Sequence, residues 1–284
     1  MWIMKVRVQR LGTGIGWRPE LALSIARDET IEFVEVVAEN ISVDAIPLPL
    51  TQLAERGIKV VPHGISLSLG GAERPSSKRL SHLARLAEKL NAPLVSEHFA
   101  FVRAGGLEAG HLLPLQRNRE ALDLLVENIL EAKAALPVPL ALENIATLFE
   151  WPRPEMDEAA FIAEAIERTD TLLLLDVSNL YANVRNHNWD LSQYLEALPL
   201  DRLAYVHVAG GVSRDGLFHD THAHEIPAGA LDLFARVCSV TDVPGVMLER
   251  DDRFPEWTEL LSELAAVTKA GMRGALRRHT AYAY

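Results

Sequence analysis

The chain has 284 residues, of which 49% are hydrophobic and 24% are charged, and its formal net charge is −11. This composition excludes wholesale disorder, and the length suits one large core such as a single α/β barrel. The negative charge disfavours a nucleic acid partner, because phosphate backbones require a basic surface and the sequence shows no basic patch. The single cysteine, Cys238, excludes an internal disulfide and a cysteine-rich metal cluster.

No stretch of the sequence approaches the roughly 18 apolar residues that are needed to span a membrane. The first residues, Met1 to Arg7, carry no apolar run long enough for a signal peptide. We therefore expect a cytoplasmic protein without a membrane segment.

Short apolar, β-prone runs alternate with helical patterns along the whole chain. Eight strands are predicted, near 11–16, 33–38, 58–65, 93–99, 138–143, 171–176, 203–208 and 244–249. Helices are predicted near 18–27, 50–56, 76–90, 117–135, 155–168, 191–197, 228–239 and 255–269. Apolar runs between helices are typical of parallel strands, and eight closed strand–helix units form a TIM-type barrel. We predict an α/β fold, a (β/α)8 barrel, with residues 1–284 as one domain and 270–284 as a C-terminal tail.

The glycines of the first predicted strand raise an alternative architecture, an open doubly wound sheet. In such a sheet, Gly12, Gly14 and Gly16 would have to form a phosphate-binding loop. Their spacing differs from the dinucleotide-binding fingerprint. We therefore interpret them as positions where the backbone turns tightly and other groups approach it closely.

Six predicted strands end at a side chain that is able to bind a metal ion. These residues are His63, His98, Glu143, Asp176, His207 and Glu249. A barrel places the carboxyl ends of all its strands on one face, so we expect the six side chains to converge. Glu143 and Asp176 are the strongest candidates, because a carboxylate in an apolar barrel interior must be paired, protonated or bound to metal.

Three further residues can join this set. Asn179 offers a carbonyl oxygen three residues after Asp176. Asp220 and His222 lie in the polar stretch 209–227, which we expect to be a functional loop, and residues two apart in extended backbone point the same way. For Arg250 we expect a salt bridge to Asp251 or Asp252. Three other histidines stay unassigned: His187, His219 and His224.

Nine donors are too many for one metal ion. Two or three ions bridged by carboxylates are implied, with Glu143 or Asp176 as natural bridges. The set mixes nitrogen and oxygen donors and contains no thiolate, which suits iron, manganese or zinc.

Nine motifs occur in a fixed order along the chain: Gly14-Ile15-Gly16-Trp17-Arg18-Pro19, Glu35 with Glu39-Asn40, His63-Gly64 with Ser68-Leu69-Gly70, Ser96-Glu97-His98, Glu143-Asn144, Asp176-Val177-Ser178-Asn179, His207-Val208-Ala209-Gly210, Asp220-Thr221-His222 and Glu249-Arg250-Asp251. From about residue 11 to about residue 266, this pattern resembles the multinuclear non-haem iron-dependent oxidative enzymes, also known as the DUF692 or UPF0276 family. The ordered set is specific, whereas each motif alone is not.

The resemblance implies a xylose-isomerase-like TIM barrel with two or three non-haem irons in its mouth. Carried over residue by residue, the implied ligands are His63, His98, Glu143, Asp176, Asn179, His207, Asp220, His222 and Glu249. Within this set we expect Glu143, Asp176 and His207 to carry the reaction. Family members use dioxygen to oxidise residues, often cysteine, of ribosomally made precursor peptides. Several work with a second protein that holds the peptide leader, so a separate partner is expected here.

Three other functions stay open. A Zn- or Mn-dependent sugar isomerase on the same barrel would need a lysine or a second acid for proton transfer, and no strand end offers a lysine. A three-zinc phosphodiesterase fits the ligand types, but the net charge of −11 disfavours DNA as its substrate. A non-catalytic metal-binding barrel would show no reaction with dioxygen.

Overall fold

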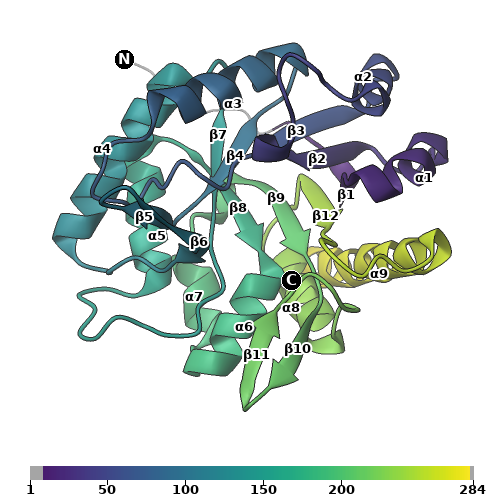
Figure 1. The fold of residues 1–284 in the computed structure, drawn as a ribbon. Coiled ribbons are helices and arrows are strands. Elements are labelled where there is room, and N and C mark those ends of the chain that lie inside the picture. Colours follow the sequence, from purple (N-terminus) through teal and green to yellow (C-terminus); the bar gives the residue numbers. More distant parts are fainter. Residues whose placement is uncertain (1–8, 282–284) are drawn as a thin grey trace.

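The structure, a computed structural model, describes residues 9–281. Within these residues, eight parallel strands close into a barrel in the order β1-β2-β3-β4-β7-β8-β9-β12 (Figure 1). The strands are β1 (Gly12–Gly16), β2 (Phe33–Val37), β3 (Lys59–His63), β4 (Val95–His98), β7 (Leu140–Glu143), β8 (Leu172–Asp176), β9 (Leu203–Val208) and β12 (Gly245–Leu248). The predicted barrel and its eight strands are confirmed. The expectation about a signal peptide concerns residues outside the described part of the chain.

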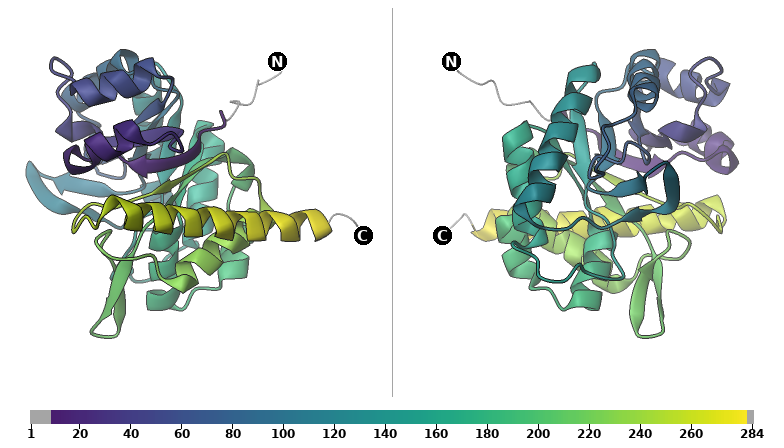
Figure 2. Two further views of the ribbon diagram at one scale, coloured as in Figure 1. Left: turned by 90° about the vertical axis from the view of Figure 1, so that its right-hand side faces the viewer. Right: turned by 60° about the vertical axis from the view of Figure 1, so that its left-hand side comes forward.

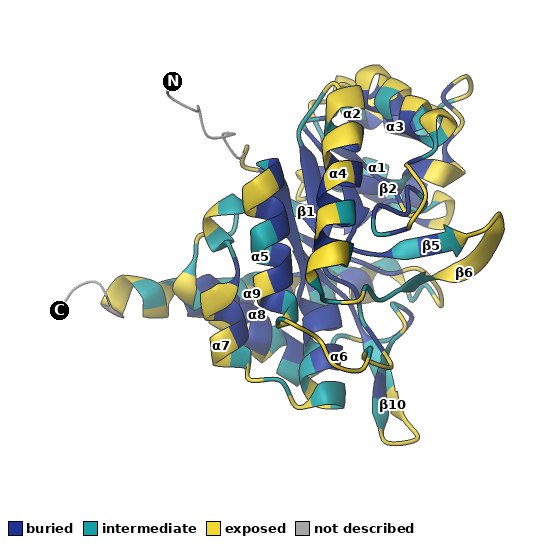
Figure 3. Cartoon of the chain, turned by 90° about the vertical axis from the view of Figure 1, so that its left-hand side faces the viewer, coloured by how far each residue is buried: buried dark blue, intermediate teal, exposed yellow. Residues whose placement is uncertain are grey.

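Helices cover the outside of the barrel, and their outward faces are exposed while their inner faces are buried (Figure 3). They are α1 (Ala22–Arg27), α2 (Leu48–Glu55), α3 (Ser77–Lys89), α4 (Arg119–Ala135), α5 (Glu158–Thr169), α6 (Val177–His187), α7 (Leu191–Ala197), α8 (Ala228–Val240) and α9 (Trp257–Ala281), with 3-10 turns η1 (Pro19–Leu21), η2 (Ala38–Asn40) and η3 (Leu200–Arg202). The eight predicted helices are present, and α6 is an additional one. In residues 9–281 no helix has the length and apolar character that crossing a bilayer requires.

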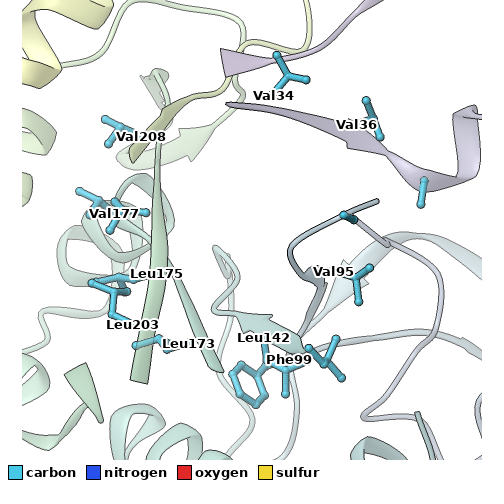
Figure 4. Packing of buried hydrophobic residues seen from close by; sticks show 14 of the residues in the cluster. Val34, Val36, Val95, Phe99, Leu142, Leu173, Leu175, Val177, Leu203 and Val208 are labelled. Atoms are coloured by element: carbon cyan, nitrogen blue, oxygen red, sulfur yellow. The ribbon is translucent and has the colours of Figure 1, made fainter. Parts of the chain in front are cut away.

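Strand residues alternate between two apolar layers, and this alternation positions the site. Leu172 and Leu174 of β8 belong to the cluster inside the barrel, whereas Leu173 and Leu175 pack in the layer between strands and helices. Figure 4 shows members of this outer layer, Leu173 and Leu175 among them, beside the strands that carry them. Because Asp176 follows in the inward register, its side chain is the next to enter the barrel interior above Leu174.

The glycine at the middle of β1 makes room for a neighbouring ring. A Cβ atom on Gly14 would lie 2.4 Å from the Phe33 ring, so no larger residue fits without displacing that ring. The interpretation of these glycines as a close approach is confirmed at Gly14.

Two antiparallel hairpins stand outside the barrel. The first joins β5 (Phe101–Ala104) to β6 (Leu107–Leu113), and the second joins β10 (Gly211–Arg214) to β11 (Leu217–Asp220). The second hairpin projects from the body of the molecule (Figure 2). It occupies part of the stretch that we expected to be a loop, because Asp215 and Gly216, at φ values of 51° and 82°, supply the left-handed turn that such a hairpin needs.

The expected tail from residue 270 is, in the structure, the final part of α9, which continues to Ala281. Two features extend the helix along α8. A Cβ on Gly274 would lie 2.2 Å from the Ala235 carbonyl oxygen, so the two helices approach closely there. Arg278 donates hydrogen bonds to the carbonyl groups of Cys238, in the last turn of α8, and of Thr241, the residue after the helix. Residues 282–284 lie outside the described part of the chain.

A largely buried carboxyl group, that of Glu158, joins α5 to α7 and yields a prediction about stability. Tyr194 donates to Glu158 at 2.9 Å, and Arg117 lies 3.9 Å from the same carboxyl group. Burial raises the pKa of Glu158 from 4.5 to about 7, although Tyr194 and Arg117 favour the charged form. The unfolded chain therefore releases this proton at lower pH than the folded protein, and stability falls as the pH rises from about 4.5 to about 7.

Glu158→Gln cannot ionise and is expected to remove this loss. Between pH 5 and pH 8, the free energy of unfolding should fall by about 1 to 3 kcal/mol less in the variant than in the wild type. Urea unfolding at the two pH values measures the difference. An equal decrease in both proteins would contradict the assignment.

Candidate metal centre

Two histidines and a carboxylate from three adjacent strands form the first donor group. His63 ends β3, His98 ends β4 and Glu143 ends β7, and their donor atoms lie within 4.8 Å of one another. Glu143 Oε2 is 3.5 Å from His63 Nε2 and 3.3 Å from His98 Nε2. Both histidines use their other ring nitrogen for a neighbour: His63 Nδ1 contacts Ser96 Oγ at 2.8 Å, and His98 Nδ1 contacts the Gly64 carbonyl at 3.2 Å.

The second donor group shares Glu143 with the first. It combines Glu143, Asp176 and His207, again within 4.8 Å. His207 Nδ1 lies 3.3 Å from Glu143 Oε1, 3.1 Å from Glu249 Oε2 and 3.9 Å from Asp176 Oδ2. Glu143 therefore faces one group with each of its two oxygens, which is the arrangement of a bridging carboxylate.

The third donor group combines Asp176 and Glu249 with His222 from the loop that follows β11. His222 Nδ1 is 3.4 Å from Glu249 Oε2, and its Nε2 is 2.5 Å from Asp220 Oδ2. The His222 backbone has a φ of 49°, a left-handed conformation that costs energy in a residue other than glycine and that clusters at functional sites. Asp220 and His222 thus meet, but not through the extended backbone that we expected.

The structure brings the nine sequence-predicted residues to one end of the barrel. Seven belong to the donor groups: His63, His98, Glu143, Asp176, His207, His222 and Glu249. Asp220 contacts the group through its hydrogen bond with His222. Asn179 lines the same cavity, and its amide nitrogen donates to the Asn144 carbonyl at 3.0 Å. The cavity has a volume of about 940 Å³ and opens toward solvent. This volume is large enough to admit several amino-acid side chains of a substrate.

Several buried polar atoms in this cluster have no hydrogen-bond partner. Among the described residues they include Glu143 Oε2, Asp176 Oδ2, His207 Nδ1 and Asp220 Oδ1. A buried polar atom left without a partner costs free energy, so native proteins rarely leave one. Four such atoms in one cluster fit a site that binds cations, and their nitrogen and oxygen chemistry matches the expected iron, manganese or zinc.

The charges of the cluster also indicate a site that binds cations. Burial lowers the pKa of His207, but Glu35, Glu143 and Glu249 outweigh it and hold the pKa well above its usual value. Burial raises the pKa of Asp176 well above its usual value, and Asp220 and Glu143 add to the effect. The carboxylates are thus so concentrated that bound protons compensate them when no metal is present. Metal ions can take the place of these protons.

Sequence reasoning missed three residues of the site. Glu35 lies 3.0 Å from His207 Nε2, and Arg18 contacts Asp251 at the cavity mouth. Asp251 also lies 3.2 Å from His222 Nδ1. All three stand in the ordered motifs, but none was assigned to the site. Glu35 was left out because it stands within β2 and not at its end, although a carboxylate in the inward register of an apolar strand is a usable signal.

The residues left unassigned have structural contacts. His187 contacts Thr147, and His224 contacts Thr221 and Arg253. His219 pairs with Val212 in the hairpin. Our expectation for Arg250 is wrong: it contacts Glu263 of α9 and not its chain neighbours, because its side chain is buried against that helix.

Comparison with known proteins adds the family. The model of the RiPP precursor modification enzymes MbnB/TglH/ChrH matches residues 12–271, where RiPP denotes a ribosomally synthesised and post-translationally modified peptide. A UPF0276 protein of Streptomyces avermitilis is 54% identical over 266 residues, which are 91% of this chain and 55% of that protein. A UPF0276 protein of Anaeromyxobacter sp. is 34% identical and is matched over 96% of its length and 94% of this chain. The chain thus spans about half of the first relative and nearly all of the second.

Solved structures support the fold class. Endonuclease IV from Thermus thermophilus aligns with a TM-score of 0.59 at 18% identity, covering 91% of this chain and 99% of that one. The 3-keto-D-glucoside 4-epimerase of E. coli aligns with a TM-score of 0.57 at 14% identity, covering 91% and 99%. At these identities the likeness concerns the barrel alone.

Proposed function

The chain belongs to the family of RiPP precursor modification enzymes MbnB/TglH/ChrH, and from this premise we propose that it oxidises a residue of a ribosomally synthesised precursor peptide with two or three non-haem iron ions and dioxygen. Cysteine is the leading candidate for the modified residue. The observation that carries the proposal is the set of overlapping donor groups with four unpartnered buried atoms.

The residues present fit iron. His63, His98 and Glu143 would hold one ion, and Glu143, Asp176, His207 and Glu249 a second. His222, with Asp220 and Asn179 beside it, would complete a third position. Bound iron would supply one-electron oxidation by dioxygen, which none of the twenty side chains performs alone.

The chain's own residues would hold the metal ions, border the cavity mouth and shield the donor atoms from water. Glu143 and Asp176 each belong to two donor groups and so set the spacing between the metal positions. The Arg18–Asp251 pair stands at the cavity mouth, and Arg18 also approaches Glu249 at 3.8 Å. The apolar layer beneath the site, with Leu174 and Met247, keeps water from the donors on that side.

A peptide suits the cavity better than the alternative substrates. Its rim carries several carboxylates, which repel phosphates and so disfavour an endonuclease reaction: Glu20, Glu39, Glu108 and Asp251. Among the described residues its lining includes no lysine, which is one of the two kinds of group that could transfer the proton in a sugar isomerase. We propose a separate leader-binding partner protein to deliver the peptide.

The test is metal analysis followed by reaction. Protein purified without oxygen should contain two or more irons per chain, and Asp176→Ala should contain fewer. The iron-loaded protein, given dioxygen and a cysteine-containing precursor peptide, should change the peptide mass. Zinc or manganese alone, persisting after iron reconstitution, would overturn the proposal in favour of an isomerase or hydrolase. Iron without any reaction toward peptides would favour a metal-binding barrel.

A further inference from the structure

A buried chain of hydrogen bonds runs beneath the candidate metal centre. His63 Nδ1 contacts Ser96 Oγ at 2.8 Å, and Ser96 Oγ contacts the Tyr205 hydroxyl at 2.7 Å. The Tyr205 hydroxyl lies 2.5 Å from Glu35 Oε2, and His207 Nε2 lies 3.0 Å from the same oxygen. The chain crosses the barrel interior from β3 to β9, and its linking residues are buried. It connects one histidine of the first donor group to the histidine of the second.

The number of available hydrogens determines the direction of every bond in this chain. A carboxylate only accepts, so Tyr205 donates its one hydroxyl hydrogen to Glu35, and His207 donates from Nε2. The Tyr205 oxygen then accepts from Ser96, whose hydroxyl has no further hydrogen to give. Ser96 therefore accepts from His63 Nδ1.

This direction fixes which ring nitrogen of each histidine keeps its hydrogen and which one is left to bind a metal ion. His63 carries its hydrogen on Nδ1 and presents Nε2 to Glu143 Oε2 at 3.5 Å. His207 carries a hydrogen on Nε2 and presents Nδ1 to Glu143 Oε1 at 3.3 Å. The two presented nitrogens are of opposite kind, yet both face oxygens of the same carboxylate.

We propose that Ser96, Tyr205 and Glu35 are positioning residues that set the ring hydrogens of His63 and His207, so that the two metal positions on either side of Glu143 depend on one shared relay. The inference rests on the metal centre of the proposed function but requires neither iron nor a peptide. Partners of this kind hold the ring orientation of metal-binding histidines, and their loss costs about 10- to 100-fold in metal affinity.

The distances alone would also fit Glu35 as a metal ligand, because donor atoms of Glu35, His207 and Glu249 lie within 4.8 Å of one another. The hydrogen bonds favour the relay. Glu35 Oε2 receives both Tyr205 and His207, and a ligand role for that oxygen would displace these donors. The experiment below separates the two roles.

Tyr205→Phe removes the single hydroxyl and keeps the ring, which packs edge-on against Phe33 at 5.9 Å. The probe is Co²⁺, titrated into metal-free protein and followed by its visible absorption. We expect Tyr205→Phe to bind Co²⁺ about 10- to 100-fold more weakly at both positions. The matched control is Tyr194→Phe, which breaks another tyrosine–glutamate hydrogen bond, the part-buried one to Glu158, outside the cavity. It should bind Co²⁺ as the wild type does.

A purely structural network would lower the melting temperature of both variants and leave Co²⁺ affinity unchanged, which overturns the proposal. Glu35→Gln that loses one bound Co²⁺, beside an unaffected Tyr205→Phe, would make Glu35 a ligand and overturn it as well. A wild type that binds no Co²⁺ removes the metal centre and the relay together. A wild type that binds metal but oxidises no peptide contradicts only the proposed function.

Nitrogen NMR gives a direct readout of the ring hydrogens. In Zn²⁺-loaded protein with ¹⁵N-labelled histidine, we expect His63 to be metal-bound through Nε2 and His207 through Nδ1. In Tyr205→Phe the ¹⁵N signals of His63 should show weaker metal binding through Nε2 or a hydrogen that has moved between the ring nitrogens. In Tyr194→Phe these signals should be unchanged. Identical patterns in wild type and Tyr205→Phe would show that the hydroxyl does not position the ring.

Discussion

Glu143→Gln is expected to lower the metal content from two or more ions per chain to one or none. The carboxylate faces His63 and His98 with one oxygen and His207 with the other, at 3.3 to 3.5 Å. Glutamine keeps the volume but loses the charge and one acceptor, so it cannot bridge. Loss of partners that only orient ligands costs about 10- to 100-fold in affinity, and loss of a bridge should exceed about 100-fold. Elemental analysis after anaerobic purification measures the effect.

Glu158→Gln is the matched control for that experiment. It neutralises a carboxyl group that is largely buried, but that lies between α5 and α7, outside the cavity. Its metal content should equal that of the wild type. Wild-type metal content in Glu143→Gln, with the protein folded, would mean that the donor groups bind independently and that Glu143 is no bridge.

Metal affinity is expected to rise steeply with pH, because metal binding must displace protons from the cluster. Burial lowers the pKa of His98, but Glu143 and Glu97 outweigh it and raise the pKa to about 9. The pKa of His207 is also raised well above its usual value. Between pH 6.5 and about 9, the apparent affinity for Zn²⁺ should therefore increase about tenfold per pH unit for each displaced proton.

The measurement is Zn²⁺ binding by chelator competition at pH 6.5, 7.5 and 8.5, with proton release from calorimetry in two buffers. The stability of the metal-free protein should change with pH in the opposite direction to the Zn²⁺ affinity. A histidine pKa raised to about 9 stabilises the fold fully below the unfolded value of 6.5, and this stabilisation is lost as the pH rises through 9. A pH-independent Zn²⁺ affinity would contradict the protonated state of the empty cluster.

The barrel could be predicted because its signals are local. A short apolar run such as Leu172 to Leu175, which is followed and preceded by helical patterns, indicates a buried strand, and the helices carry a regular apolar face. Helix α6 was missed because its asparagines and serine are weak helix formers. Its first turn depends on Asp176, which accepts from the backbone nitrogens of Ser178 and Asn179. The continuation of α9 past residue 270 depends on contacts with α8. The residues of α8 that make these contacts are distant in sequence, so local patterns do not reveal them.

The sequence by itself determined which side chains reach the carboxyl face of the barrel. Strand alternation fixes the side on which each residue lies, and the closed parallel order places all strand ends at the same face. Only the tertiary structure decided how seven of the nine predicted residues divide into overlapping donor groups, and that Glu35 and Tyr205 stand beneath them. That division depends on the stagger of neighbouring strands and on side-chain distances of a few ångströms. Such distances follow from the packing of the entire barrel and not from any one segment of the chain.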